Sequence, residues 1–442
     1  MGHITSKNYD NLQKRLDKSP QGAPASDALF QIIEILFTKE EAGLVSVLPI
    51  KPFTVKTASK KWKKSEKAAK KILDNLADKG LLLDIFDGKK QTYIIPPTMA
   101  GFFEFSIMRT DGRFDNKVLS ELFYQYINVE EDFLNEVLAL DPSIARVLVQ
   151  ESSLQKKHEA EILDYERASK VIETAICITV GTCYCRHKME HKGLACNKPQ
   201  DVCLTFNTAA KSLSKHGVAK KISKAEAKKI LDKCVGLGLV QIGDNVQNSV
   251  SWICNCCSCC CEAIQAYKKL GYNMHIKTNF YPKNNYENCT GCGVCSIKCP
   301  VDVITMVEKN GKKQPVVDLD KCFGCGVCVR FCPKGNITME RRKETAFVPK
   351  DSFERFVMTA INENKLQNLI FDNYTSWTNE IMRRFLGIIL NLSSVKRRLA
   401  SQQLQSRFIH KLSKTYFTLA KSFINMEKPD YSHPELKNNK KK

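Results

Sequence analysis

One pattern occurs twice in this chain, as Cys289-Thr-Gly-Cys292-Gly-Val-Cys295-Ser-Ile-Lys-Cys299-Pro300 and as Cys322-Phe-Gly-Cys325-Gly-Val-Cys328-Val-Arg-Phe-Cys332-Pro333. Both copies read C-x-x-C-x-x-C-x-x-x-C-P, the spacing with which thiolates bind a cluster of four irons and four sulfides. Paired C-x-x-C motifs also occur in structural zinc sites. Two complete four-cysteine runs, each ending in C-P, favour iron–sulfur clusters over zinc.

The repeat and its flanks, from Asn279 to Glu344, resemble the bacterial two-cluster ferredoxins. The resemblance implies that each 4Fe–4S cluster takes three thiolates from one run and the fourth from the other. The implied ligands are Cys289, Cys292, Cys295 and Cys332 for one cluster, and Cys322, Cys325, Cys328 and Cys299 for the other. Between the runs, apolar residues on both sides of Asn310-Gly311 predict a β-hairpin.

Ten further cysteines fall into two groups, which suggest a second metal centre. The groups are Cys183, Cys185, Cys196 and Cys203, and Cys254, Cys256, Cys257, Cys259, Cys260 and Cys261. Thiolates at this density repel one another unless a cation neutralises them. Neither group has a familiar four-ligand spacing, so the sequence leaves open which members are ligands. We expect the two groups to form one shared centre with one or two further iron–sulfur clusters, zinc being less favoured.

His187 and His191 lie four residues apart and could share a helical face as zinc ligands. The favoured interpretation is that they are solvated or hydrogen-bond to the ligands. The order of the cysteine groups also resembles uncharacterised multi-cysteine ferredoxin-domain proteins of anaerobic bacteria, over about residues 25 to 345. That resemblance implies no particular reaction.

The last two cysteines, Cys177 and Cys234, are predicted core residues. Cys177 lies in the apolar run Ala-Ile-Cys-Ile-Thr-Val, where cysteine packs as a small hydrophobic residue. Cys234 belongs to a segment, 223–239, that echoes segment 65–81 at an offset of 158, and it falls where Leu76 falls. Each copy of this echo has an N-cap serine, helical apolar spacing and a glycine stop.

The first copy of the echo lies within residues 26–97, where helices and a two-stranded wing resemble a winged helix-turn-helix domain. The second copy has no clear wing and is expected to cover or support the cysteine groups. Segment 51–71 of this region carries nine lysines and one acid, a density that suits DNA phosphates. It contains no arginine to read guanine edges. A solvated lysine-rich face is therefore favoured, and DNA is the less favoured partner.

The predicted fold class is α+β with several domains. The expected order is a tail (1–25), a winged-helix-like domain (26–100), a helical connector (101–175), a cysteine-rich metal domain with the second helix echo (176–265), a two-cluster 4Fe–4S ferredoxin domain (266–345), and a basic helical extension with a disordered tail (346–442). The basic helical pattern of residues 350–425 favours a hairpin packed on the protein over peripheral contact with a membrane.

The composition frames the expected function. The chain has 442 residues, 20 cysteines and a net charge of +21. Many unpaired cysteines and no apolar signal segment predict a reducing cytoplasm, and the charge predicts an acidic redox partner protein. No nucleotide-binding glycine motif is present, so no small-molecule substrate is identified. We therefore predict an iron–sulfur electron-transfer protein, with a redox-sensing transcription regulator as the alternative.

Overall fold

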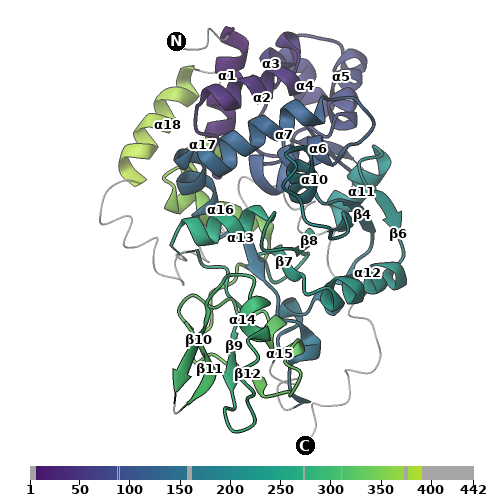
Figure 1. Ribbon diagram of the computed structural model, residues 1–442. Coiled ribbons are helices and arrows are strands. Elements are labelled where there is room, and N and C mark those ends of the chain that lie inside the picture. Colours follow the sequence, from purple (N-terminus) through teal and green to yellow (C-terminus); the bar gives the residue numbers. More distant parts are fainter. Residues whose placement is uncertain are drawn as a thin grey trace, which may run out of the picture.

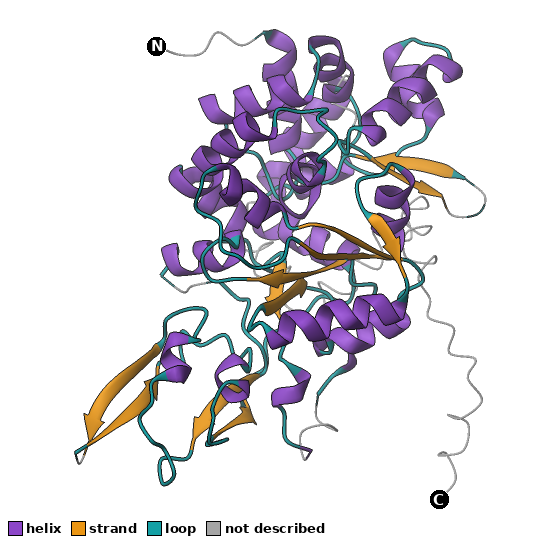
Figure 2. Ribbon diagram, turned by 45° about the vertical axis from the view of Figure 1, so that its right-hand side comes forward, coloured by secondary structure: helices purple, strands orange, loops and turns teal. Residues whose placement is uncertain are grey.

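The computed structural model describes residues 6–86, 88, 90–156, 162–271, 274–309, 311–372 and 377–390. These residues form a mixed structure of helices and sheets. Helices gather at one end, a six-stranded sheet lies in the middle, and two small two-stranded sheets project at the other end (Figure 1, Figure 2). A continuous hydrophobic core runs from the N-terminal helices to the end that carries the two repeated cysteine runs.

The N-terminal part consists of helices followed by two antiparallel strands. Its elements are α1 (Lys7–Asp17), α2 (Asp27–Leu36), α3 (Lys39–Ser46), α4 (Val55–Trp62), α5 (Glu66–Asp78), β1 (Leu83–Phe86) and β2 (Gln91–Ile94). The expected tail over residues 1–25 instead contains α1, which buries Leu12 and Leu16 and packs against α3. The elements expected between residues 26 and 97 are present, and the winged-helix resemblance remains a prediction.

The connector is helical, as its apolar spacing predicts. Its elements are η1 (Thr98–Phe102), α6 (Phe103–Met108), α7 (Asn116–Tyr124), η2 (Gln125–Val129), α8 (Glu131–Phe133), η3 (Leu134–Leu138), β3 (Ala145–Val147), η4 (Glu151–Ser153), η6 (Asp164–Glu166) and α9 (Ala168–Thr174). Phe103, Phe123, Tyr126 and Phe133 pack ring against ring in its core. Strand β3 was not expected, and it supplies an edge of the central sheet.

The cysteine-rich domain is built on the antiparallel sheet β3-β7-β8-β5-β4-β6. Its elements are β4 (Ile178–Thr182), α10 (Tyr184–His191), β5 (Asp201–Phe206), α11 (Asn207–Lys215), β6 (Lys220–Ile222), α12 (Lys224–Gly236), β7 (Val240–Asp244), β8 (Trp252–Cys256) and α13 (Glu262–Lys269). The expectation that the second echo copy lacks a wing needs correction. Helix α12 is followed by the antiparallel pair β7 and β8, as α5 is followed by β1 and β2.

The two copies of the echo share their local chemistry. Ser65 and Ser223 each accept a backbone N–H at the helix start, and Gly80 and Gly238 each have positive φ after the helix end. The signal for a second wing was weak because β8 carries cysteines where β2 carries ordinary strand residues. The region of the second copy therefore does more than cover the cysteine groups, since strand β8, which follows α12 and β7, itself carries Cys254 and Cys256.

The segment with the repeated cysteine runs forms the end that projects below the sheet in Figure 1. Its elements are β9 (Phe280–Asn284), α14 (Val294–Ile297), β10 (Ile304–Lys309), β11 (Lys312–Val317), α15 (Val327–Arg330) and β12 (Ile337–Arg341). Strands β10 and β11 form the predicted hairpin, with Lys309 opposite Lys312, and β9 pairs with β12. Asn310, the first residue of the expected turn, lies outside the described residues.

The described part of the C-terminal extension contains α16 (Ser352–Asn362), α17 (Leu366–Ile370) and α18 (Trp377–Leu390). Helix α16 packs against the rest of the protein through Val357 and Ala360, and α18 leaves Ile381, Phe385 and Ile388 exposed. The predicted basic helices and tail after residue 390 lie outside the described residues. None of the described helices is long and apolar enough to cross a membrane.

Candidate metal centres

The first cysteine run and the last cysteine of the second run meet near the surface. Cys289, Cys292, Cys295 and Cys332 line one small cavity of about 30 Å³, which is the grouping that the ferredoxin resemblance implies. Cys292 is exposed and Cys289 and Cys332 are half-buried. We call these four residues the exposed cluster site.

The second run and Cys299 lie deeper. Cys322, Cys325, Cys328 and Cys299 are all buried, and the charge of Cys299 acts on each of the other three. Burial raises the pKa of Cys322 to about 11 and that of Cys325 further, so these thiols stay protonated until a metal displaces the proton. We call these four residues the buried cluster site.

Backbone geometry around the second run favours sulfur ligation. The N–H of Gly324 donates to the sulfur of Cys322 at 3.4 Å. Gly324 and Gly326 have φ of 73° and 86°. A Cβ at Gly324 would lie 2.0 Å from the carbonyl oxygen of Phe280, and one at Gly326 would lie 2.1 Å from the Ser153 hydroxyl oxygen. Only glycine fits such a left-handed, closely packed position.

The matching family model agrees with this geometry. Residues 288–336 match the 4Fe-4S dicluster domain family. This segment is therefore an iron–sulfur domain of the ferredoxin type, and both cysteine runs lie within it. No curated protein matches the chain significantly. The 4Fe-4S dicluster domain occupies a small part of the 442 residues, so the cysteine-rich domain has to be interpreted from its own geometry.

The two cysteine groups of the cysteine-rich domain do meet. Strands β5 and β8 are neighbours, with Leu204 opposite Ile253, which places Cys203 beside Cys254. The buried ion pair between Lys188 and Glu262 joins α10, which follows Cys183, to α13, which follows Cys261. The strand register brings together residues 51 positions apart, Cys203 and Cys254, and the ion pair joins residues 74 positions apart.

Four of the ten thiols form a compact group. The sulfurs of Cys196, Cys257, Cys259 and Cys260 all lie within 4.8 Å of one another. Cys196 comes from the loop between α10 and β5, and the others come from the turn after β8. We call this group the four-thiol set. Its pKa values are perturbed, since a hydrogen bond from Cys260, with help from Arg186, lowers the pKa of Cys257 to about 4.

The other six thiols form a connected chain. Hydrogen bonds link Cys183 to Cys185, Cys185 to Cys261, Cys261 to Cys256, Cys256 to Cys254, and Cys254 to Cys203. We call these residues the six-thiol set. Shared hydrogen bonds lower the pKa of Cys254 and Cys261 and raise that of Cys185 and Cys256, because one sulfur of each pair keeps the proton.

The six-thiol set faces a large cavity. This cavity of about 730 Å³ lies between the cysteine-rich domain, the N-terminal part and α16, and all six thiols line it. Cys257 also touches its wall, whereas Cys196, Cys259 and Cys260 do not. The other lining residues are mainly apolar and include Ile95, Met99, Phe105 and Phe356. The ten thiols thus divide into a compact set beside the cavity and an open set within it.

Arg186 lies between the two sets. No role for this residue was predicted from the sequence. Its guanidinium donates to the carbonyl of Asn255 at 3.1 Å from both terminal nitrogens and to the sulfur of Cys257 at 3.6 Å. The charges of Cys183, Cys257 and Cys256 raise the pKa of Arg186 despite its burial. A buried cation at this point offsets thiolate charge in both sets. Its position within Cys185-Arg186-His187 was the available signal.

The remaining candidates lie outside these sets. Cys177 and Cys234 are buried, and burial raises the pKa of Cys234 to about 11. His187 Nδ1 bonds the carbonyl of Ile107 at 2.9 Å, and its Nε2 lies 3.1 Å from that of His191. Among the described residues, no histidine belongs to a compact group of metal-binding side chains.

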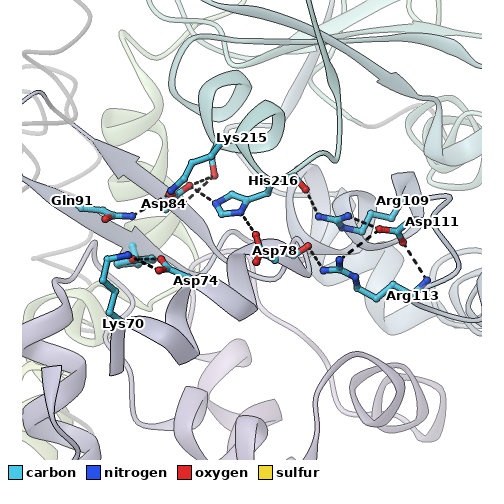
Figure 3. Close-up of polar contacts among 12 residues, drawn as sticks. Lys70, Asp74, Asp78, Asp84, Gln91, Arg109, Asp111, Arg113, Lys215 and His216 are labelled. Atoms are coloured by element: carbon cyan, nitrogen blue, oxygen red, sulfur yellow. Dashed lines mark hydrogen bonds and ion pairs between the residues drawn. The ribbon is translucent and has the colours of Figure 1, made fainter. Parts of the chain in front are cut away.

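The N-terminal part is held against the cysteine-rich domain by a polar network (Figure 3). Asp84 on β1 bonds Lys215, the last residue of α11, and His216, which follows it, and His216 also bonds Asp78 at the end of α5. Burial alone would lower the pKa of His216, but these two carboxylates raise it. The end of α5 and strand β1 thus bind to the C-terminal end of α11 and to His216 in the same chain.

Proposed function

We propose that the chain passes electrons from an external carrier protein, through the 4Fe-4S dicluster domain, to a metal centre in the cysteine-rich domain. When bound, iron–sulfur clusters supply one-electron transfer, and the protein supplies thiolates, N–H donors and shielding. The observation that carries the proposal is the difference in exposure between the two cluster sites. One opens to solvent through Cys292, whereas the other is buried on the side of the cysteine-rich domain.

Two bridges, one of them through Gln150 of the connector, join the buried cluster site to the cysteine-rich domain. The carbonyl of Cys325 accepts the N–H of Gln150 at 2.9 Å, and the Gln150 amide donates to the carbonyl of Leu239 at 3.0 Å. Leu239 packs in one cluster with Cys257 and Cys260. A second bridge joins Phe323 to Tyr267 of α13, whose rings lie 4.6 Å apart. These bridges give a short packed route between the two cysteine-bearing regions.

The exposed cluster site has the surface that an acidic carrier would recognise. Exposed Lys298, Lys313 and Lys334 lie on the segments around it, and Ile297 beside them is 81% exposed. The carbonyl oxygen of Lys313 lies against Gly291, between Cys289 and Cys292. A basic rim around an apolar contact accelerates encounter with an acidic partner.

The six-thiol set is the proposed electron acceptor. A four-iron cluster needs four cysteine ligands, and six thiols in one wall exceed this number, which favours a larger iron–sulfur centre. The set lines the cavity between the cysteine-rich domain, the N-terminal part and α16. Arg186 supplies a fixed positive charge that stabilises added electrons.

The test is the rate at which a reduced acidic ferredoxin reduces the anaerobic full chain, followed by loss of cluster absorbance. Replacing Lys298, Lys313 and Lys334 together by Glu should lower the second-order rate about tenfold or more at low salt. The difference should shrink at high salt because exposed charges are screened. A small neutral mediator should reduce wild type and variant equally.

The matched control replaces three exposed lysines of α4 and α5, Lys56, Lys60 and Lys67, by Glu. It carries the same change in net charge at the opposite end of the molecule (Figure 1). The control should keep the wild-type rate to within about twofold. A control that slows as much as the test variant would show that net charge, or a different face, governs the encounter, and the proposed entry point would be rejected.

A further inference from the structure

The spacing of the four-thiol set differs from the spacing that a four-iron cluster requires. A tetrahedral ion with metal–sulfur bonds of about 2.3 Å places its sulfurs roughly 3.8 Å apart. In the four-thiol set the sulfurs of Cys259 and Cys260 are 3.6 Å apart, and all four lie within 4.8 Å of one another. A cubane binds each thiolate to a different iron, so it holds the sulfurs farther apart.

We propose that Cys196, Cys257, Cys259 and Cys260 bind one tetrahedral metal ion, zinc or iron, without bridging sulfide. The ion would be separate from the clusters of the dicluster domain and from the centre of the six-thiol set. The inference stands on the sulfur geometry alone and does not depend on the proposed direction of electron flow.

The surroundings of the four-thiol set suit four thiolates around one divalent ion, which carry a net charge of about −2. The N–H of Cys260 donates to the sulfur of Cys257, and the N–H of Cys196 donates to that of Cys260. Arg186 adds a cationic donor to Cys257 at 3.6 Å. Such N–H···S bonds offset the negative charge and orient the ligands.

The four-thiol set supplies a complete ligand shell for one ion, as structural metal sites do. Four thiols complete a tetrahedron and leave no position for a further ligand, whereas reactive metal sites keep one open. Three of the four lie off the cavity wall. The ion would fix the turn 257–260 to the loop that carries Cys196. Cys256 and Cys261 flank this turn, so the ion would also hold them in the wall of the six-thiol set.

The experiment measures zinc, iron and acid-labile sulfide per chain in the anaerobically purified full-length protein. Cys259→Ala is the first variant, because Cys259 is exposed and its removal leaves packing intact. It should lose about one metal ion while sulfide stays unchanged. Cys196→Ala should give the same result. Loss of zinc identifies a structural brace. Loss of iron, with a mononuclear ferric signal in electron paramagnetic resonance, identifies an electron relay.

Two controls separate this site from its neighbours. Cys203→Ala, in the six-thiol set, should lower iron and sulfide together and keep the single ion. Cys177→Ala, buried outside both sets, should change none of the three quantities. The proposal is overturned if Cys259→Ala and Cys196→Ala lower sulfide together with iron, because the thiols then belong to a cluster. It is also overturned if neither variant changes the metal content.

Discussion

The 4Fe-4S dicluster domain and the cysteine-rich domain both gather thiols, but they do so by different routes. In the dicluster domain three of the four cysteines of each cluster site lie within seven residues, and only the fourth comes from the other run. In the cysteine-rich domain each set draws on both cysteine groups, which the pairing of β5 with β8 brings together. The comparison shows that local spacing specifies the first kind of site, whereas sheet register specifies the second.

The interleaving of the second kind of site has a structural cause. Cys254 and Cys256 lie two residues apart on β8, so their side chains point to the same face of the sheet. That face borders the cavity. The chain then turns at 257–260, where Cys259 and Cys260 lie off the cavity wall and Cys257, Cys259 and Cys260 gather with Cys196. One short segment can therefore serve two sets because its backbone changes from strand to turn within it.

The largest expected effect comes from a substitution that removes the buried cluster site of the dicluster domain. Cys325→Ala should remove one cluster, about four irons with their sulfide, and leave the exposed cluster site loaded. Reduction of the cysteine-rich domain by a protein donor should then fall to near zero, because the route through Gln150 begins at Cys325. Iron, sulfide and rapid-mixing reduction rates check this. Unchanged reduction of the cysteine-rich domain would show that electrons enter elsewhere.

The next effect tests the ion pair that joins the cysteine groups. Lys188→Met leaves Glu262 buried without its partner, which should destabilise the protein by about 3–5 kcal/mol. Iron should be lost from the cysteine-rich domain first, since Lys188 contacts Asn128, Glu262 and Tyr124, which all lie outside the dicluster domain. Anaerobic denaturant unfolding measures the change. The double variant Lys188→Met/Glu262→Gln should recover part of the loss, and a double variant no better than the single one would contradict the pairing.

Sequence alone predicted the iron–sulfur domain and its β10–β11 hairpin, because the cysteine spacing and the apolar strand residues are local features. The assignment of individual cysteines to clusters stays a prediction. The sequence also predicted α12 and the burial of Cys234 through the echo with α5. It did not predict the division of ten cysteines into two sets, because that division depends on which strands pair. Nor did it identify Arg186 or the Lys188–Glu262 pair, whose roles exist only once distant segments meet.

A smaller effect concerns the contact between the N-terminal part and the cysteine-rich domain. The fold raises the pKa of His216, so the protonated imidazole stabilises the contact. This contribution is complete below about pH 6.5, the ordinary value for histidine, and is lost as the pH rises through the raised pKa of the folded state. His216→Gln should cost about 1–2 kcal/mol at low pH and less at high pH. Equal costs across the pH range would show that His216 acts only by packing.

The smallest expected effect comes from Cys234→Ala. This thiol is fully buried beside the four-thiol set but belongs to neither set. Removing its sulfur should destabilise the fold by about 1 kcal/mol through lost packing and leave zinc, iron and sulfide unchanged. Metal analysis and denaturant unfolding check both parts. A lost metal ion would make Cys234 a ligand and would redraw the boundary between core and metal centre.

The most direct test of the account is the iron content of the anaerobically purified full chain beside that of Cys203→Ala/Cys254→Ala. Wild type should carry clearly more than the about eight irons of two four-iron clusters, with matching sulfide. The double variant lacks two adjacent ligands of the six-thiol set and should fall to about eight, plus one if the four-thiol set holds iron. Equal iron in the two proteins, at eight or fewer, would contradict an iron–sulfur centre in the cysteine-rich domain.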